Sequence, residues 1–186
     1  LREIPDESVD LVLTDPPYGI AFFSNMSNDA EYRDNLKSVD GIYNDGNDNT
    51  AFLAEVIHEL ARVLKNDSHI YWFTRWVRIQ SQQPIFEKYS SVKNAIVWDK
   101  GSGSMGDLLG SYSGYYETIL FAQKGRRELN CVGDKRRHPD ILRVNKIPAR
   151  RLRHSHEKPE ELIEFLIEKS SDEGEVVLDP FAGSGT

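Results

Sequence analysis

Hydrophobic and polar residues are distributed along this chain in a pattern that predicts short buried strands separated by amphipathic helices. Five segments consist mainly of aliphatic, aromatic and β-branched residues, which is typical of strands buried on both faces. They are residues 9–14, 69–74, 92–98, 116–123 and 175–179. Apolar residues recur at helical spacing in residues 50–67, 75–89 and 159–171, with a break expected near Pro84. This order of elements predicts an α/β domain with a largely parallel sheet.

Two polar segments interrupt the pattern and are expected to be loops. Residues 19–49 are rich in Asn, Asp, Gly and Ser, and a connection of that length favours a mobile lid. Residues 99–114 carry several glycines, which favour either a loop that moves near a bound ligand or a flexible linker. The tryptophans Trp72, Trp76 and Trp98 are expected in the core and on strands rather than stacked on a base.

Length and composition narrow the class of protein. A chain of 186 residues suits one domain with its own core. The chain contains no run of about 18 apolar residues, so we expect no membrane-spanning segment and no membrane partner. The single cysteine, Cys131, excludes an internal disulfide and fits a cytoplasmic protein. Without a cysteine cluster or an HExxH motif, we expect no metal site.

The net charge of −7 hides a strong segregation of charge. Residues 124–158 contain 12 Lys and Arg against 4 Asp and Glu, a local charge of +8, and the rest of the chain carries −15. A basic segment of this size indicates either a solvated surface or, as we predict here, a surface for a polyanion. Few apolar residues anchor this segment, so it is expected to be an insert that depends on a partner.

The stretch TDPPYG (residues 14–19) follows a buried strand and carries the first candidate site. Pro16 and Pro17 remove two backbone donors and stiffen an extended chain. The carboxylate of Asp15 and the carbonyl of Pro16 are then two fixed acceptors, which match the two hydrogens of an exocyclic –NH2 group. Tyr18 offers a flat face, on which stacking of a base is worth about 1–3 kcal/mol. An ordinary proline-stiffened strand exit is the simpler alternative.

The stretch DPFAGSGT (residues 179–186) follows the last predicted strand and carries the second candidate site. Its glycines allow a tight turn and close approach of the backbone to a ligand, although a G-x-G turn alone is equally typical of ordinary structure. Asp179 would repel a pyrophosphate and attract an ammonium group. This favours a cofactor with an amino-acid head group.

Taken together, TDPPYG and DPFAGSGT resemble the amino-group DNA methyltransferases that use S-adenosylmethionine. Further blocks that are similar to this family are WDKGSGSMG (98–106), YETILFAQKG (116–125) and HSHEKPEEL (154–162), the last with the pattern H-x-x-x-K-P. The catalytic motif precedes the basic segment and the cofactor loop, as in the circularly permuted beta group. Members of that group with Asp at the first catalytic position mostly methylate adenine N6, and those with Ser mostly methylate cytosine N4.

The resemblance implies a class I, Rossmann-like methyltransferase sheet with an antiparallel strand near one edge. It divides the chain into a catalytic part (1–123), a basic target-recognition insert (124–153) and a cofactor-binding part (154–186). It implies catalytic roles for Asp15, Pro16, Pro17 and Tyr18. Residues implied to bind the cofactor are His154, Lys158, Pro159, Asp179, Phe181, Ala182, Gly183, Ser184, Gly185 and Thr186. Residues expected to contact double-stranded DNA are Arg126, Arg127, Lys135, Arg136, Arg137, Arg143, Lys146, Arg150, Arg151 and Arg153.

The expected reaction is methylation of adenine N6 in a base flipped out of DNA, in a bacterial or phage-encoded protein that is a monomer or a homodimer. The alternatives are cytosine N4, a glutamine amide as in the release-factor methyltransferases, a DNA-binding module without catalysis, and a nucleotide-dependent oxidoreductase. The chain starts at Leu1 and stops within the glycine-rich loop. We therefore expect a fragment truncated at both ends, without the acidic residue that binds the cofactor ribose in this family.

Overall fold

The computed structural model describes residues 1–18, 49–103, 109–133, 137–148, 150 and 157–182, which are built around one six-stranded sheet. The strands are β1 (Val9–Thr14), β2 (Leu64–Thr74), β3 (Ser91–Asp99), β4 (Tyr116–Lys124), β5 (Ile141–Arg143) and β6 (Val177–Leu178). Their order across the sheet is β5-β3-β4-β2-β1-β6. β4 is antiparallel to both neighbours, and the other pairs are parallel. The parallel strands therefore all end where β4 begins, at what we name the carboxyl end of the sheet.

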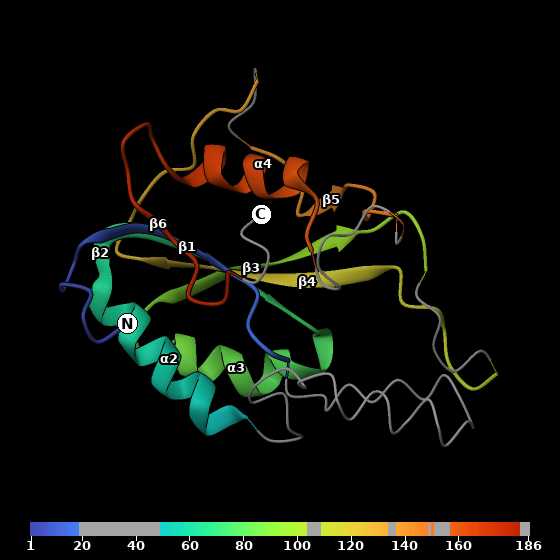
Figure 1. Cartoon of the computed structure of the whole chain (residues 1–186), viewed down its shortest axis with the longest axis horizontal. Coiled ribbons are helices and arrows are strands. Elements are labelled where there is room, and N and C mark those ends of the chain that lie inside the picture. Colours follow the sequence, from blue (N-terminus) through green and yellow to red (C-terminus); the bar gives the residue numbers. More distant parts are fainter. Residues whose placement is uncertain (19–48, 104–108, 134–136, 149, 151–156, 183–186) are drawn as a thin grey trace.

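Helices cover both faces of this sheet (Figure 1). On one face lie α2 (Thr50–Val63) and α3 (Ile79–Phe86), the latter preceded by the short 3-10 helix η1 (Trp76–Arg78). On the other face lies α4 (Glu160–Ser170). The lid expected at residues 19–49 falls, apart from Asn49, outside the described residues.

Alternation of side chains along the strands fills two separate cores. In β1, Val12 packs on the side of α2 and α3, whereas Leu11 and Leu13 pack on the side of α4. Both faces of β1 are buried, which explains its nearly continuous apolar sequence. Residues that continue the series Leu11, Leu13 beyond the strand must also face α4.

The first predicted helix is shorter, and the strand after it longer, than the sequence pattern indicates. α2 ends at Val63 instead of Asp67, because Leu64 adopts extended backbone angles (φ −74°, ψ 130°) and pairs with Val9. Asp67 then takes a positive φ of 58°, which no helix accommodates. Leu64 continues the apolar stripe of the helix and is fully buried, so its side chain fits either element and only the pairing with β1 decides between them.

One further expectation is wrong. Trp76 is 63% exposed instead of buried, because β2 ends at Thr74 and the chain turns outward into η1; Trp72 and Trp98 are buried as predicted. Within the basic segment, Ile141–Arg143 forms the edge strand β5 against β3. The last predicted strand is reduced to two residues, Val177–Leu178.

His69 is a buried residue of β2 whose ring is held at both nitrogens. Nε2 lies 3.1 Å from the Arg127 carbonyl, which can only accept, so Nε2 carries the hydrogen and donates it. Nδ1 is then the acceptor for the Ser170 hydroxyl at 2.9 Å, and Ser170 in turn accepts from Tyr71 at 2.8 Å. Burial lowers the pKa of His69 to about 4, which keeps the ring neutral.

We expect this residue to make the full-length protein less stable in mild acid, by about 2 kcal/mol between pH 7 and pH 5. The unfolded ring, with a pKa of 6.5, takes up a proton on acidification, whereas the folded ring stays neutral until the pH approaches 4. The contribution of the neutral His69 ring to stability is therefore present above about pH 6.5, and it decreases as the pH falls from 6.5 toward 4. Urea unfolding of the wild type and of His69→Gln at both pH values measures this, and equal acid losses in the two proteins would contradict it.

Candidate active site

Asp15 lies directly after β1, at the carboxyl end of the sheet, and its side chain faces α4. This orientation follows from strand alternation, because Asp15 continues the series Leu11, Leu13. Glu117, near the start of β4, continues the series Ile119, Phe121 in the same way. Two carboxylates from strands that are not neighbours are thus directed to the same face of the sheet.

Lys158, in the segment just before α4, joins these two carboxylates. Its Nζ lies 2.7 Å from Asp15 Oδ2 and 3.0 Å from Glu117 Oε2. Lys100, just beyond β3, approaches the other oxygen of Glu117, Oε1, at 3.3 Å. The result is a compact group of two carboxylates and two ammonium ions in which the charges balance.

The ionisation of this group is set by burial and by the opposite charges together. Burial favours the neutral form of Glu117, but the ammonium groups of Lys158 and Lys100 outweigh it and lower the pKa of Glu117. Burial likewise disfavours charge on Lys158, but Asp15 and Glu117 outweigh it and raise the pKa of Lys158. Both residues are therefore charged at neutral pH.

Tyr18 closes the group from the side of the loop that follows β1. Its hydroxyl donates to Glu117 Oε2 at 3.2 Å, and its ring centroid lies 5.9 Å from Lys158 Nζ. Burial, followed by the carboxylates of Asp15 and Glu117, raises the pKa of Tyr18 well above its ordinary value, so the hydroxyl remains a donor. The ring is only partly buried.

One oxygen of Asp15 is left without a donor. Oδ2 is bound by Lys158, but Oδ1 is buried and has no hydrogen-bond partner in the part of the chain that the structure describes. The neighbouring carbonyl of Pro17 accepts from Asn49 Nδ2 at 2.8 Å. Because buried acceptors are normally satisfied, an unpaired Oδ1 beside the Pro16 peptide indicates a place for an external donor.

The second candidate motif meets the first across the pair β1 and β6. Thr14 Oγ1 donates to Asp179 Oδ1 at 2.5 Å, and the same oxygen accepts from the backbone nitrogen of Phe181 at 2.9 Å. Burial is the main reason that the pKa of Asp179 is raised, and the Asp15 carboxylate adds to it. Phe181 packs edge-on against Phe52 of α2, with ring centroids 6.2 Å apart. Asp15 and Asp179 therefore lie at the same end of the sheet, although 164 positions separate them in the sequence.

Several predicted site residues fall outside the described residues. For the cofactor site these are His154, Gly183, Ser184, Gly185 and Thr186, and for the DNA surface Lys135, Arg136, Arg151 and Arg153. Of the described cofactor candidates, Pro159 is buried at the start of α4, and Ala182 is exposed beyond Phe181.

The described basic residues separate into two groups at opposite ends of the sheet. Arg143 ends β5 next to Asp99, and Lys146 donates to the Gly103 carbonyl at 3.0 Å, so both lie at the carboxyl end, as Asp15 does. Arg126 and Arg127 follow the antiparallel strand β4 and lie at the amino end instead. A strand of nine residues such as β4 spans about 30 Å, so one short DNA contact cannot include both groups. Arg137 and Arg150 are exposed.

Arg127 is held by acidic residues of this chain. Nη1 and Nη2 donate to the two carboxylate oxygens of Glu175 at 2.9 and 2.7 Å, and Nη2 also donates to Asp172 at 3.1 Å. Only 15% of the Arg127 side chain is exposed. By contrast, 83% of the Arg143 side chain is exposed. These contacts favour a structural role for Arg127.

We expect Arg127→Met to destabilise the full-length protein by about 1–3 kcal/mol and to leave the salt dependence of DNA binding unchanged. The matched variant Arg143→Met should leave stability unchanged and lower the slope of log Kd against log salt by about one. Urea unfolding and DNA titrations over a range of salt concentrations measure both effects. The assignment would be reversed if Arg127→Met reduced the salt slope as Arg143→Met is expected to do.

Three residues of the site were missed by sequence reasoning: Glu117, Lys100 and Asn49. Glu117 had a usable signal, because an acidic residue in register with the buried Ile119 and Phe121 is unusual for a strand. Lys100 and Asn49 lie in polar loops where no pattern distinguishes them from their neighbours.

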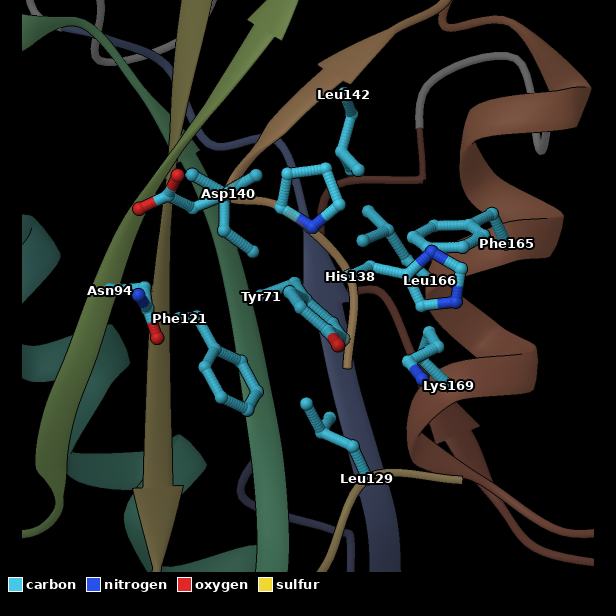
Figure 2. A pocket seen from close by; sticks show the side chains of 12 residues that line it. Tyr71, Asn94, Phe121, Leu129, His138, Asp140, Leu142, Phe165, Leu166 and Lys169 are labelled. Carbon is cyan, nitrogen blue, oxygen red and sulfur yellow. The ribbon is translucent and has the colours of Figure 1, made fainter. Parts of the chain in front are cut away.

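A separate hollow lies between α4 and the sheet (Figure 2). Tyr71, Phe121, Leu129, His138 and Phe165 are among the residues that line it. Several of its lining side chains are engaged within the chain: Lys169 donates to the Asn130 carbonyl, Tyr71 contacts Ser170, and the His138 ring packs edge-on against Phe165. We interpret the hollow as imperfect packing beneath α4.

Among the described helices, none is long and apolar enough to cross a bilayer. The described residues also include no cluster of three or more His, Cys, Asp or Glu side chains suited to a metal ion.

This fold is that of the class I methyltransferases. It superposes on the PvuII cytosine-N4-specific DNA methyltransferase with a TM-score of 0.69, at 12% identity, over 96% of this chain and 69% of that chain. The M1.HpyAVI–SAM complex gives a TM-score of 0.62 at 23% identity, over 95% of this chain and 72% of that chain. The sequence profile of the DNA methylase family N6_N4_Mtase matches residues 9–186, and the chain belongs to that family.

Individual relatives are similar along the whole chain. The DNA adenine methyltransferase YhdJ of Escherichia coli (strain K12) is 29% identical over 218 residues, which cover 100% of this chain and 69% of YhdJ. The type II methyltransferase M.BglII of Bacillus subtilis is 29% identical over 225 residues, which cover 100% of this chain and 58% of M.BglII. The type II methyltransferase M.HpaI of Haemophilus parainfluenzae is 30% identical over 207 residues, which cover 100% of this chain and 61% of M.HpaI. The chain thus spans 58–69% of the length of these three relatives.

Proposed function

We propose that the protein containing this chain transfers a methyl group from S-adenosylmethionine to the N6 amine of adenine in double-stranded DNA. The observation that carries the proposal is the buried Oδ1 of Asp15, which lies beside two prolines and a tyrosine and has no hydrogen-bond partner among the described residues. The family already indicates a DNA methylase. Asp, and not Ser, at position 15 favours adenine, and YhdJ, which is named an adenine methyltransferase, is similar over the whole chain.

The residues at the end of β6 fit the cofactor. Asp179 is a half-buried carboxylate at the carboxyl end of the sheet, which suits an ammonium group, and the backbone nitrogen of Phe181 donates to it at 2.9 Å. We propose that Asp179, Phe181 and the glycine-rich loop hold S-adenosylmethionine. When bound, this cofactor supplies an electrophilic methyl group.

The remaining steps belong to Asp15, Pro16 and Tyr18. The target base leaves the duplex at a cost of a few kcal/mol, and stacking on the Tyr18 ring offsets part of that cost. Asp15 Oδ1 and the Pro16 carbonyl then accept the two hydrogens of the amine. These bonds fix the direction of the nitrogen lone pair, and positioning of this kind supplies most of the acceleration of a direct displacement. As the nitrogen gains the methyl group, the carbon–sulfur bond would break and leave a neutral thioether. The nitrogen also gives up one proton, and Asp15 Oδ1, which accepts a hydrogen bond from that N–H, is placed to take it.

DNA is proposed to lie across the carboxyl end of the sheet, where Arg143 and Lys146 flank the site. Both side chains are exposed in the described part of the chain, and both lie at the same end as Asp15. Their interaction with phosphates should weaken as salt rises.

Methylation with tritium-labelled S-adenosylmethionine, followed by digestion of the DNA to nucleosides, tests the proposal. Label in N6-methyldeoxyadenosine supports it. Label in N4-methyldeoxycytidine would move the target to cytosine, and label only in protein would exclude DNA as the substrate. Without any label but with retained DNA binding, the protein would be a binding module.

A further inference from the structure

Lys158 occupies an unusual position for a residue that the family resemblance implies to bind the cofactor. Its ammonium lies between Asp15 Oδ2 at 2.7 Å and Glu117 Oε2 at 3.0 Å, and 11% of its side chain is exposed. The rings of Phe73, Trp98 and Tyr18 surround it, with centroids 5.1, 5.8 and 5.9 Å from Nζ. Lys158 is thus enclosed beside the proposed catalytic carboxylate.

This contact determines which oxygen of Asp15 is free. A carboxylate beyond the end of a strand can rotate about two side-chain bonds, and either oxygen could face a substrate. The ammonium binds Oδ2 and leaves Oδ1 buried without a partner in the described chain. A fixed acceptor direction matters, because a displacement of about 1 Å at a reacting centre can cost about 100-fold in rate.

Glu117 holds Lys158 in place. It accepts from Lys158 and Tyr18 through Oε2 and from Lys100 through Oε1, so one carboxylate ties together three segments that are distant in the sequence. Without Glu117, the ammonium would be enclosed with a single counter-charge. Lys100 in turn balances the charge of Glu117 itself.

We infer that Lys158 is a positioning residue that orients the Asp15 carboxylate toward the substrate amine, and that Glu117 acts through Lys158 by fixing it. The inference rests on the proposed function of Asp15 and adds a role that differs from cofactor binding. Lys158 donates its hydrogens to carboxylates of this chain, so its contribution should be found in turnover and not in cofactor affinity.

The test is a double-mutant cycle in the full-length protein with Lys158→Met and Asp15→Asn. We expect Lys158→Met to lower kcat by about 10–100-fold. The Kd for S-adenosylmethionine, measured by calorimetry, should stay within about twofold of the wild-type value. In the Asp15→Asn background, Lys158→Met should change kcat by less than about threefold, since the oriented group is already gone. A raised Kd with unchanged kcat, or losses that multiply in the double variant, would overturn the inference.

Two further variants separate positioning from general damage. Glu117→Gln retains an acceptor for Lys158 without the charge, so it should lower kcat in the same direction and by less. Lys65→Met removes a 2.7 Å ion pair to Asp10, at the other end of the same strand β1, and should leave kcat unchanged. If Lys65→Met lowered kcat as much as Lys158→Met, the effect would be one of folding, and the inference would fail.

Crystal structures of the wild type and of Lys158→Met provide a readout that does not depend on activity. We expect the Asp15 carboxylate to hold one orientation in the wild type and to rotate or divide between two orientations in the variant. An unchanged carboxylate would refute the positioning role. A wild-type protein that methylates no DNA would refute the proposed function instead, while the carboxylate orientation would still decide the role of Lys158.

Discussion

Replacing Asp15 with asparagine is expected to lower kcat for methyl transfer by about 10²–10³-fold, with little change in the affinity for DNA or cofactor. Asparagine has the same shape but no charge, and its amide nitrogen cannot accept a hydrogen bond. It therefore loses the ion pair with Lys158 and weakens the hydrogen bond that Oδ1 accepts from the substrate amine. Single-turnover methylation, DNA titration and calorimetry with S-adenosylmethionine measure the three quantities.

The stability of this variant is an internal control. Lys158 keeps Glu117 as a partner at 3.0 Å, so the unfolding midpoint in urea should remain close to that of the wild type. Turnover at the wild-type rate by a folded Asp15→Asn protein would remove Asp15 from the mechanism.

Replacing Tyr18 with alanine is expected to lower kcat/KM for DNA by about 10–100-fold, which corresponds to the loss of about 1–3 kcal/mol of stacking on the flipped base. The cofactor should bind as before, because the residues proposed to hold it lie at and beyond the end of β6. A fluorescent base analogue, 2-aminopurine, placed at the target position reports unstacking from the duplex. The rise in its fluorescence when the protein binds the DNA should be smaller with this variant than with the wild type.

Tyr18→Phe is the matched control, because it keeps the ring and removes only the hydroxyl that donates to Glu117 at 3.2 Å. We expect it to retain most of the capture of the flipped base. If Tyr18→Phe were as impaired as Tyr18→Ala, the hydroxyl and its bond to Glu117, and not the aromatic face, would be the functional part of Tyr18.

The locations of the buried strands and helices followed from local pattern, because burial on two faces and burial on one face produce different hydrophobic periods. The residues at which helices and strands begin and end were predicted less well from the local pattern. Leu64 fits the apolar stripe of α2 and the pairing with Val9 equally, and only the contact with β1 ends the helix there. Trp76 is expected in the core, whereas its exposure follows from the end of β2 two residues earlier.

For the candidate site, the chemical groups follow from residue type alone: a carboxylate and a carbonyl stiffened by Pro16 and Pro17, an aromatic face at Tyr18, and a glycine-rich turn after Asp179. What surrounds these groups depends on how distant segments pack. Packing joins Lys158 to Asp15 and Glu117, and it separates Arg127 from Arg143 by the length of the sheet. This difference arises because residue type and local period are properties of short segments. Ion pairs between strands depend on the order and direction of those strands, which no single segment encodes.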